Sequence, residues 1–441
     1  MGAADCTGFT TRQVHAGEGS GGATPRATPI YLTAGFSFGE YGDAAAHFGN
    51  GEGYAYTRIG NPTVETVERT IADLEGGSQA LLLASGQAAT AVALMSIVSA
   101  GQHIVSSNHI YEGTRGLLVD SLSRFDISTD FVDDLNDPAA WERLIRPETR
   151  ALFAESISNG PNRILDIEAI AEVAHRHGIP LVIDNTLATP YLLRPLEHGA
   201  DVVVHSASKF LAGHGAVLGG VIIDNGRFDA ASTGVLFPQL TEVPRGCTQS
   251  FAGRAAGDAR IAYARESVAP RFGPTPSPLN AFLIGQGIET LSLRVERQTA
   301  NARALAEALA AHPQVAQVDH PDLPGHPEHA LVERYLPAGP GAVFTITLRG
   351  GDEAAERFVE ALEVFTHMTH IGDVRSLVLH PGSTSHTLLD AEQKAAVGVY
   401  PGTLRLSIGI EDAADLIADV TAALEVLEAV APADVPAAVS A

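Results

Sequence analysis

The chain has 441 residues, of which 45% are hydrophobic, so it can bury a large core and is expected to form two domains. Its 52 acidic and 28 basic residues give a net charge of −24 at pH 7, which argues against nucleic acid or an anionic membrane surface as a partner. The two cysteines, Cys6 and Cys247, lie far apart, so the sequence has neither a disulfide framework nor a zinc-binding spacing.

The sequence shows no segment typical of secretion or membrane insertion. No charged-then-apolar signal peptide stands at its start. The most apolar region, residues 80–101, is interrupted by polar residues at 85–87 and at Thr90, which excludes a membrane span. We therefore expect a soluble, cytoplasmic protein, in which any anionic ligand is held by local donors.

Residues 1–55 are predicted to form an amino-terminal arm. They are rich in glycine, alanine and threonine and show little sustained hydrophobic periodicity. The segment 17–22 (GEGSGG) matches a dinucleotide-binding glycine pattern, but it follows no strand and Pro25 comes soon after it. We interpret this segment as a flexible loop.

A turn and a helix are predicted after the arm. The turn is Asn61-Pro62-Thr63, acidic side chains follow within residues 64–68, and Gly76-Gly77 ends the helix. Tyr56 and Arg58 precede the turn, and taken by themselves they indicate a surface pair.

A strand at 80–84, a glycine turn and an apolar helix at 88–99 come next. The turn, Ser85-Gly86-Gln87, brings free backbone N–H groups and a helix N-terminus to one point, which is a ready site for an anion. A simple tight turn is the alternative. Serines further along the chain favour a phosphate site at Gly86 and Gln87.

Two further strands are predicted at 102–107 and 151–155. Tyr111 follows the first and Asn159 follows the second. A helix at 167–177 ends at a glycine. Strands and helices therefore alternate between residues 81 and 223, which is typical of a parallel sheet covered on both faces.

The strongest chemical signal comes from the apolar runs 181–184 and 201–205, which both stop at polar residues. Such runs are typical of strands buried on both faces of a parallel sheet. The segment between them is long enough for a short crossover helix. As neighbouring strands they would place Asp184 and Lys209 on the same edge, where open α/β sheets bind ligands.

These two residues suit pyridoxal phosphate (PLP). A buried lysine loses its charge by forming a Schiff base with a carbonyl cofactor. An acidic partner such as Asp184 would keep the ring nitrogen protonated. Ser206 and Ser208 flank Lys209 with hydroxyls suited to phosphate oxygens. A structural Lys–Asp ion pair is the alternative.

The carboxyl-terminal part is expected to form a second unit. Periodicity weakens over 228–278, which we interpret as a domain connection and part of the active-site rim. A helical tract at 280–311 follows, then a half-buried strand at 341–348. Arg405 lies within another apolar strand, 404–410, where a guanidinium could grip a carboxylate or form a structural salt bridge.

No metal site is predicted. His320, His326 and His329 lie among prolines without a regular ligand spacing.

Several of these stretches resemble the Cys/Met-metabolism family of PLP enzymes. The chain contains Asp184-Asn-Thr186, His205-Ser-Ala-Ser-Lys209 and Gly213-His-Gly215 in the order of the family signature. The segments 370–373, 376–381 and 404–410 continue the family pattern. The resemblance covers about residues 10 to 430.

The resemblance implies roles for the residues singled out above. Catalysis would rest on Lys209, Tyr111 and Asp184, with Tyr111 stacked over the pyridine ring and Asn159 contacting its hydroxyl. The implied cofactor contacts are Tyr56, Arg58, Ser85, Gly86, Gln87, Tyr111, Asn159, Asp184, Ser206, Ser208 and Lys209. The implied substrate contacts are Arg405, on the α-carboxylate, Ser376 and Asn159.

The resemblance also implies the architecture. We expect fold type I, an α/β fold with a mostly parallel, seven-stranded-type sheet and a smaller carboxyl-terminal α/β domain. The expected limits are 1–55 for the arm, 56–260 for the PLP-binding domain and 261–441 for the small domain. Tyr56 and Arg58 would cross to the partner's phosphate in a homodimer with shared active sites, itself expected within a homotetramer.

Within the family the sequence is similar to the O-acetylhomoserine sulfhydrylases. This implies replacement of the acyl group of an O-acylated homoserine by sulfide or a small thiol. The alternatives are γ-elimination, as in methionine γ-lyases, and the cystathionine γ-synthase or lyase reactions. A nicotinamide-dependent oxidoreductase would need a glycine fingerprint after a strand, which is absent, and a non-catalytic protein would have no use for Lys209 with Asp184.

The segment 111–116 bears on the choice of substrate. The cystathionine-handling branch of the family has an arginine that binds a distal carboxylate, and its counterpart here is Gly116. Glu112 adds a negative charge, whereas Arg115 could substitute after a shift of one residue. We therefore expect an O-acylhomoserine with sulfide or a small thiol to be preferred over cystathionine and over cysteine as nucleophile.

Overall fold

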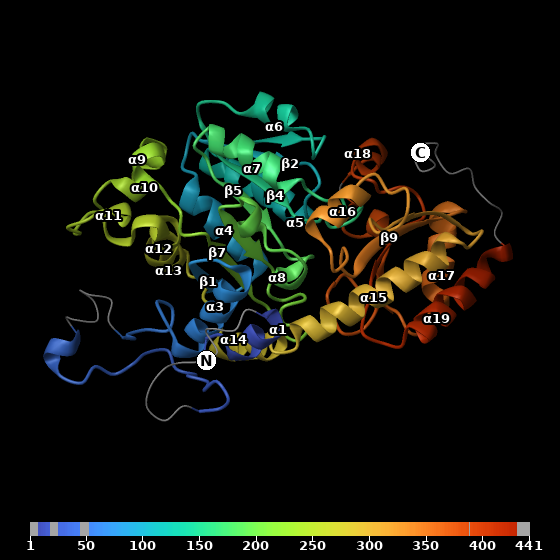
Figure 1. Cartoon of the computed structure of the whole chain (residues 1–441), viewed down its shortest axis with the longest axis horizontal. Coiled ribbons are helices and arrows are strands. Elements are labelled where there is room, and N and C mark those ends of the chain that lie inside the picture. Colours follow the sequence, from blue (N-terminus) through green and yellow to red (C-terminus); the bar gives the residue numbers. More distant parts are fainter. Residues whose placement is uncertain (1–7, 18–24, 45–52, 388, 430–441) are drawn as a thin grey trace.

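Two β-sheets organise the chain in the computed structural model, which describes residues 8–17, 25–44, 53–387 and 389–429 (Figure 1). The first sheet is built from residues 79–224 and the second from residues 315–407. Apart from Gly17, the glycine-rich segment 17–22 lies outside the described residues. The domain limits after residues 55 and 260 stay predictions.

The first sheet has seven strands in the order β1-β7-β6-β5-β4-β2-β3. Neighbouring strands from β6 to β3 are parallel, whereas β7 runs antiparallel to both β6 and β1. The strands are β1 (Gln79–Leu83), β2 (His103–Ser107), β3 (Ser128–Val132), β4 (Thr149–Glu155), β5 (Leu181–Asp184), β6 (Val202–His205) and β7 (Gly220–Asp224). The mostly parallel sheet expected from the sequence is confirmed.

Helices cover both faces of this sheet. Along β6, Val203 packs into one core while Val202 and Val204 pack into the other. The covering helices are α3 (Pro62–Glu75) and α7 (Ile167–Arg176) on the first face and α4 (Gly86–Ile97) on the second. Burying each valine stabilises the fold by about 1.5–3 kcal/mol, which explains the uninterrupted apolar runs of the central strands.

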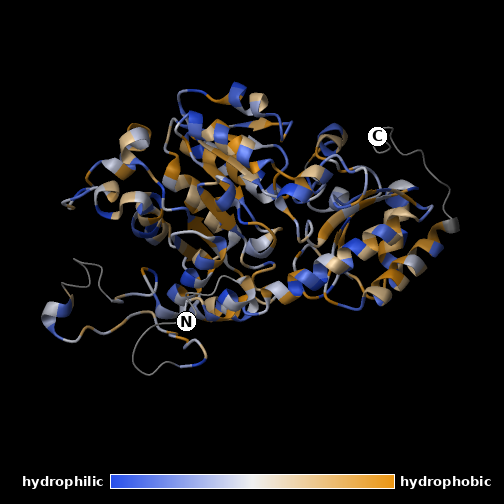
Figure 2. Ribbon diagram, in the orientation of Figure 1, coloured by the Kyte–Doolittle hydropathy of each residue, from blue (hydrophilic) through white to orange (hydrophobic). Residues whose placement is uncertain are grey.

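The second sheet has the order β10-β11-β12-β9-β8 and is antiparallel except for the β10–β11 pair. Figure 1 shows helices α15, α17 and α19 along one side of it, and Figure 2 shows the apolar strands of both sheets inside more polar helices. The elements are β8 (Val315–Asp319), β9 (Val343–Leu348), β10 (Thr366–His367), β11 (Leu377–Leu379), β12 (Thr403–Ser407), α15 (Leu291–Ala310), α17 (Gly351–Ala361) and α19 (Ala413–Glu425). Helix α14 (Pro278–Ile288), which precedes α15, packs against α3 of the first sheet.

Three features of the fold differ from the sequence-based expectation. Strand β3 was not predicted, because it is a short, half-exposed edge strand with a weak apolar signal. Strand β9 is buried on both faces instead of one, since it lies between β12 and β8 in the middle of its sheet. The helical tract predicted at 280–311 is two helices, and the guanidinium of Arg294 binds the Gly287 carbonyl near the break.

The remaining helices are short. The region expected to be a domain connection contains several of them, packed beside β1, and the backbone N–H of Ala84 donates to the Pro274 carbonyl. The short helices are α1 (Phe9–His15), α5 (Glu112–Gly116), α6 (Pro138–Leu144), α8 (Thr189–Leu192), α9 (Ala230–Thr233), α10 (Pro238–Thr241), α11 (Phe251–Ala255), α12 (Ala259–Tyr263), α13 (Ala269–Phe272), α16 (His329–Tyr335) and α18 (Ala391–Ala396). Within the described ranges, no helix has the length and apolar character needed to cross a membrane.

Candidate active site

Asp184 and Lys209 lie at the same edge of the first sheet. Asp184 is the last residue of β5, and Lys209 lies in the turn that follows the neighbouring parallel strand β6. The two segments are bonded to each other, because the Ser206 backbone N–H donates to Thr186 Oγ1 over 2.8 Å. Thr186 in turn donates to Asp184 Oδ1 through both its backbone N–H and its hydroxyl. The carboxyl edge predicted from the sequence is therefore where these residues meet.

Lys209 is half-buried and lies close enough to Arg405 to be affected by its charge. Its Nζ lies 3.0 Å from Nδ1 of His370, a residue that the sequence analysis did not single out. Burial, together with the charge of Arg405, lowers the pKa of Lys209 to about 8. With this pKa about a tenth of Lys209 is a neutral amine at pH 7, far more than for an exposed lysine. The neutral amine is the form that attacks a carbonyl or accepts a proton.

Two acidic side chains lie side by side at this edge. Glu155, the last residue of β4, pairs in register with Asp184. Burial raises the pKa of Asp184, and burial and the Asp184 charge raise that of Glu155 to about 8. A nearby cation stabilises the ionised form of a buried carboxyl. The pair therefore fits a protonated ring nitrogen.

Asp184→Asn should bind some cofactor but turn over about 10²–10³-fold more slowly, since losing one preorganised charge partner has about that effect. The amide oxygen can still accept from Thr186, so the turn should persist. Visible absorption and kcat of the purified variant test this. Asp201→Asn is the matched control, because Asp201 is also buried but precedes β6 and bonds His175; equal kcat losses in the two variants would contradict the role of Asp184.

The turn at Ser85, Gly86 and Gln87 forms a tight cradle against Ser206. Ser85 caps helix α4, which begins at Gly86 rather than at residue 88 as predicted, and its side chain accepts from the Ala88 N–H. A Cβ added to Gly86 would lie 2.7 Å from the Ser206 Cβ, so this approach requires glycine. Helix geometry leaves the first N–H groups of α4 without intrahelical acceptors. This arrangement fits the expected phosphate site.

The two serines that flank Lys209 differ in their surroundings. The Ser208 hydroxyl donates to the Gly219 carbonyl and accepts from the Gly219 N–H. The Ser208 hydroxyl therefore links the turn after β6 to the segment before β7. Ser206, in contrast, lies beside Gly86. Of the two, Ser206 is the better placed to meet a phosphate.

Tyr111 is held by its backbone and by the glycine that follows Glu112. Its N–H donates to Glu155 Oε1 over 2.7 Å. A Cβ at Gly113 would lie 2.3 Å from the Tyr111 ring, so the ring position depends on this glycine. Gln87 Nε2 donates to the Gly113 carbonyl, which ties the cradle to the Tyr111 segment. Glu112 begins α5 without a left-handed backbone.

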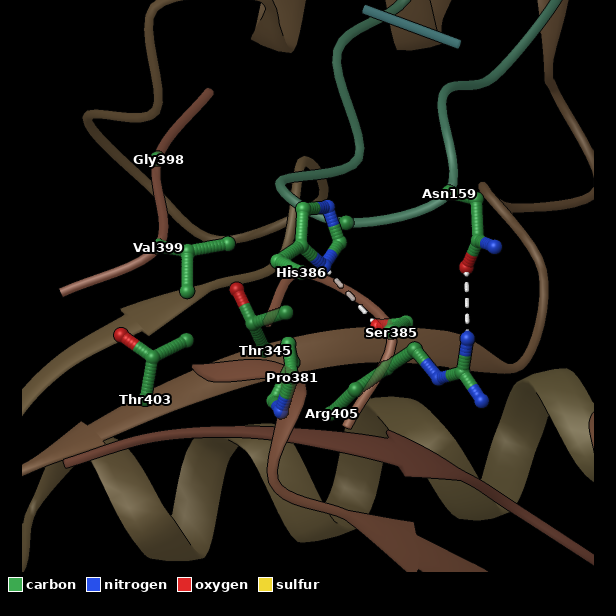
Figure 3. A pocket seen from close by; sticks show the side chains of 10 residues that line it. Asn159, Thr345, Pro381, Ser385, His386, Gly398, Val399, Thr403 and Arg405 are labelled. Carbon is green, nitrogen blue, oxygen red and sulfur yellow. Dashed lines mark hydrogen bonds between the residues drawn. The ribbon is translucent and has the colours of Figure 1, made fainter. Parts of the chain in front are cut away.

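Arg405 and Asn159 line a small pocket, and Figure 3 shows Arg405 pointing to the Asn159 amide. Arg405 Nη1 donates to Asn159 Oδ1 over 3.0 Å, and Nη2 donates to the His370 carbonyl over 3.3 Å. Burial lowers the pKa of Arg405 to about 10, and among the described residues it forms no salt bridge. The described residues therefore give the salt-bridge alternative no support, and the guanidinium remains available for an anionic ligand.

One hydrogen-bonded path connects these residues. Glu155, which the sequence analysis did not single out, accepts from the backbone N–H groups of both Tyr111 and Asn159. The Asn159 side chain accepts from Arg405. Arg405 also donates to the carbonyl of His370, the residue whose side chain contacts Lys209. The site thus joins segments from both sheets.

Other predicted residues lie differently. Ser376 is fully buried, and its hydroxyl donates to Glu411 and accepts from Gly409. This leaves its predicted role as a substrate contact without support. Arg58 donates to the Pro270 carbonyl over 2.7 Å and lies over the ring of the exposed Tyr56.

The three histidines considered for metal binding make other contacts or lie buried. His326 bonds Asp319 over 2.7 Å, and His329 bonds the Pro321 carbonyl. In the part of the chain that the structure describes, no group of three or more potential ligands surrounds a metal position.

Comparisons with known proteins found similar sequences and a similar solved structure. The sequence model of a family described as Cys/Met metabolism PLP-dependent enzyme matches residues 10–425. The chain is 42% identical over 424 residues to the O-acetyl-L-homoserine sulfhydrylase of Corynebacterium glutamicum, covering 94% of this chain and 96% of that protein. It is 41% identical over 424 residues to the homocysteine synthase of Schizosaccharomyces pombe, covering 95% and 98%. A solved structure of a putative O-acetylhomoserine (thiol)-lyase from Campylobacter jejuni, which contains a pyridoxyl-lysine phosphate, matches with a TM-score of 0.88 at 33% identity, covering 95% and 99%.

Proposed function

The chain belongs to the Cys/Met metabolism PLP-dependent enzymes, and from this premise we propose that it replaces the γ-substituent of an O-acylated homoserine with sulfide or a small thiol. The products are homocysteine or a related thioether amino acid, and the released carboxylic acid. The observation that carries the proposal is the buried Arg405 guanidinium, which has no acidic partner within the described ranges and is connected to the segment beside Lys209. One carboxylate site and one amine base are what an O-acylhomoserine requires.

The fold is fold type I, and the cofactor is PLP. When bound, PLP supplies a ring that accepts the electrons released at the substrate Cα. Asp184 would hold the ring nitrogen, Tyr111 would stack on the ring and Asn159 would meet its hydroxyl. The phosphate would be held by Ser85, Gly86, Gln87 and Ser206, with Tyr56 and Arg58 contributed by a second chain.

The protein side chains divide the remaining work. Arg405 grips the α-carboxylate, since a guanidinium presents two parallel N–H donors to a carboxylate. Lys209 Nζ removes the proton from Cα and would pass it on to the bound cofactor. As a free amine again, it then removes one from Cβ, which prepares loss of the γ-substituent. The low pKa of Lys209, caused by burial and by Arg405, keeps the amine able to accept these protons.

The surroundings of Arg115 support the choice of an O-acylhomoserine. Its guanidinium donates to the Asn108 carbonyl over 2.8 Å, lies over the Phe131 ring and pairs with Glu112 at 3.4 Å. Gly116 stands where the cystathionine-handling branch has an arginine, and Arg115 was the residue that could have taken its place. These contacts already occupy the Arg115 guanidinium. A second, distal carboxylate would therefore find no matched cation in this segment.

An O-acylhomoserine with sulfide or a small thiol should show a higher kcat/KM than either cystathionine cleavage or the use of cysteine as nucleophile. The absent charge-assisted bond is worth about 1.5–3 kcal/mol, which corresponds to about a tenfold to hundredfold preference. Specificity constants for the three reactions test this. Arg115→Ala is the control and should leave their ratio unchanged.

A clear preference for cystathionine would overturn the assignment. Release of ammonia and a 2-oxo acid at the same rate with and without sulfide would replace it with γ-elimination.

We further propose a cytoplasmic homotetramer built from dimers that share their active sites. Tyr111 is 46% exposed and Tyr56 45% exposed in the single chain, and apolar side chains such as Leu32 (73%) and Phe272 (61%) are exposed as well. Exposed apolar groups of this size are typical of surfaces that a partner covers. A second chain there would bring its own Tyr56 and Arg58 with it.

Mixing an inactive Arg58→Ala chain with an inactive Lys209→Ala chain should restore part of the activity. In the mixed dimer the site that keeps Lys209 receives an intact Arg58 from the other chain, so one of the two sites is complete. Activity after co-expression and separation of the tagged heterodimer measures this. Mixing Asp184→Asn with Lys209→Ala is the negative control, because each of its sites has a defect; no recovery in the first pair, despite isolated heterodimers, would contradict shared sites.

A further inference from the structure

His370 makes its side-chain contact with the reactive lysine itself. Nζ of Lys209 and Nδ1 of His370 are 3.0 Å apart, although 161 positions separate the two residues in the sequence. When Lys209 is an ammonium it has no lone pair, so the imidazole Nδ1 then accepts the hydrogen bond and the ring proton lies on Nε2. Nε2 is buried and has no hydrogen-bond partner among the described residues. The contact with Lys209 is therefore what orients the ring.

The backbone on both sides of His370 is held in place. Gly372 has φ +72°, and a Cβ there would lie 2.7 Å from the backbone nitrogen of Phe210, next to Lys209. The Val374 N–H donates to the Gly213 carbonyl over 2.9 Å. The Arg405 bond to the His370 carbonyl adds a third tie. The loop 370–374 is thus packed directly on the turn that carries Lys209.

The surrounding charges keep this imidazole neutral. Lys209, Arg405 and Arg375 are the cations acting on His370, and Asp373, which acts in the opposite sense, is already paired with Arg375 at 2.9 Å. Burial and the Lys209 charge, with the smaller effect of the arginines, lower the pKa of His370 to about 4. Because the pKa of Lys209 is about 8, a proton shared between them resides on the lysine. His370 is therefore suited to accept a hydrogen bond from Lys209, and not to relay a proton.

We propose that His370 is a positioning residue for Lys209: its imidazole accepts a hydrogen bond from Nζ and directs the amine toward the substrate bound at Arg405. The inference rests on the proposed function, because it assumes that Lys209 is the base that acts on an amino acid. A lysine side chain has several rotatable bonds, so a fixed acceptor limits the directions in which its lone pair points.

Two substitutions separate this role from simple packing. His370→Asn keeps a hydrogen-bond acceptor close to the position of Nδ1, whereas His370→Leu keeps the bulk and removes the acceptor. His370→Leu should lower kcat about 10- to 100-fold, the effect typical of a misplaced reacting group, with KM for the amino acid unchanged. His370→Asn should retain most of the activity. Equal kcat values, or a better-tolerated leucine, would overturn the proposal.

A second readout needs no turnover. Lys209 and Lys394 are the chain's two lysines, so acylation of the full-length, cofactor-free protein followed by peptide mass spectrometry reports on Lys209 with Lys394 as an internal reference. The acceptor stabilises the ammonium, so the pKa of Lys209 should fall in His370→Leu and stay in place in His370→Asn. An unchanged pKa in His370→Leu would overturn the contact.

The two readouts distinguish the possible failures. A wild-type enzyme that is inactive on every O-acylhomoserine but shows the expected labelling would refute the proposed function and uphold the Lys209–His370 contact. Circular dichroism confirms folding of each variant. If the leucine variant does not fold, nitrogen NMR of the imidazoles in the cofactor-free wild type, assigned with His370→Asn, tests the same contact; a protonated Nδ1 at neutral pH would contradict it.

Discussion

Lys209→Ala should abolish turnover, with a loss of at least about 10²–10⁴-fold in kcat from its role in proton transfer alone. Lys209 lies at the carboxyl edge of the first sheet, and burial together with the charge of Arg405 lowers its pKa to about 8. These surroundings make its amine a base and a nucleophile near neutral pH. We expect the purified enzyme to absorb in the visible, and borohydride to remove this absorption while fixing the cofactor to a peptide that contains Lys209.

The other lysine provides the control. Lys394 lies on α18 and donates to the Gly382 carbonyl over 3.0 Å. Lys394→Ala should keep both the visible absorption and the borohydride-trapped peptide. Normal turnover of Lys209→Ala, or trapping on Lys394, would refute the whole assignment of the site.

Arg405→Lys should lower kcat/KM for the amino-acid substrate about 30- to 4,000-fold, mainly through a higher KM. Removing one partner of a buried, hydrogen-bonded charge pair costs about 2–5 kcal/mol, and a lysine cannot reproduce the two parallel donors of a guanidinium. Arg405 is buried, with Asn159 and the His370 carbonyl as its present acceptors. Steady-state kinetics with varied O-acylhomoserine measure the effect.

Arg260→Lys is the matched variant for this experiment. Arg260 is equally buried but is paired with Asp224 at 2.9 Å, away from the pocket. Its replacement should lower the midpoint of thermal unfolding and leave KM unchanged. A similar KM for Arg405→Lys and the wild type would show that the carboxylate binds elsewhere.

The sequence by itself was sufficient to predict the features that depend on residues close together in the chain. Strands β5 and β6 are short apolar runs that end at polar side chains, and this pattern is local because both faces of a buried parallel strand need apolar contacts. Helix α3 was predictable from Asn61 at its start and Gly76 in a left-handed conformation at its end. The adjacency of Asp184 and Lys209 followed because one short crossover joins their strands.

Only the tertiary structure decided the contacts between distant segments. Arg405 and Asn159 are 246 positions apart, and Lys209 and His370 are 161 apart. The sequence did not indicate that Arg405 pairs with no acid in the part of the chain that the structure describes, nor that the Ser376 hydroxyl donates to Glu411. Arg115 was likewise ambiguous until its contact with Phe131 was seen. The reason is physical: a local pattern reports which face of an element is buried, whereas the partner of a buried polar group is set by how the two sheets pack together.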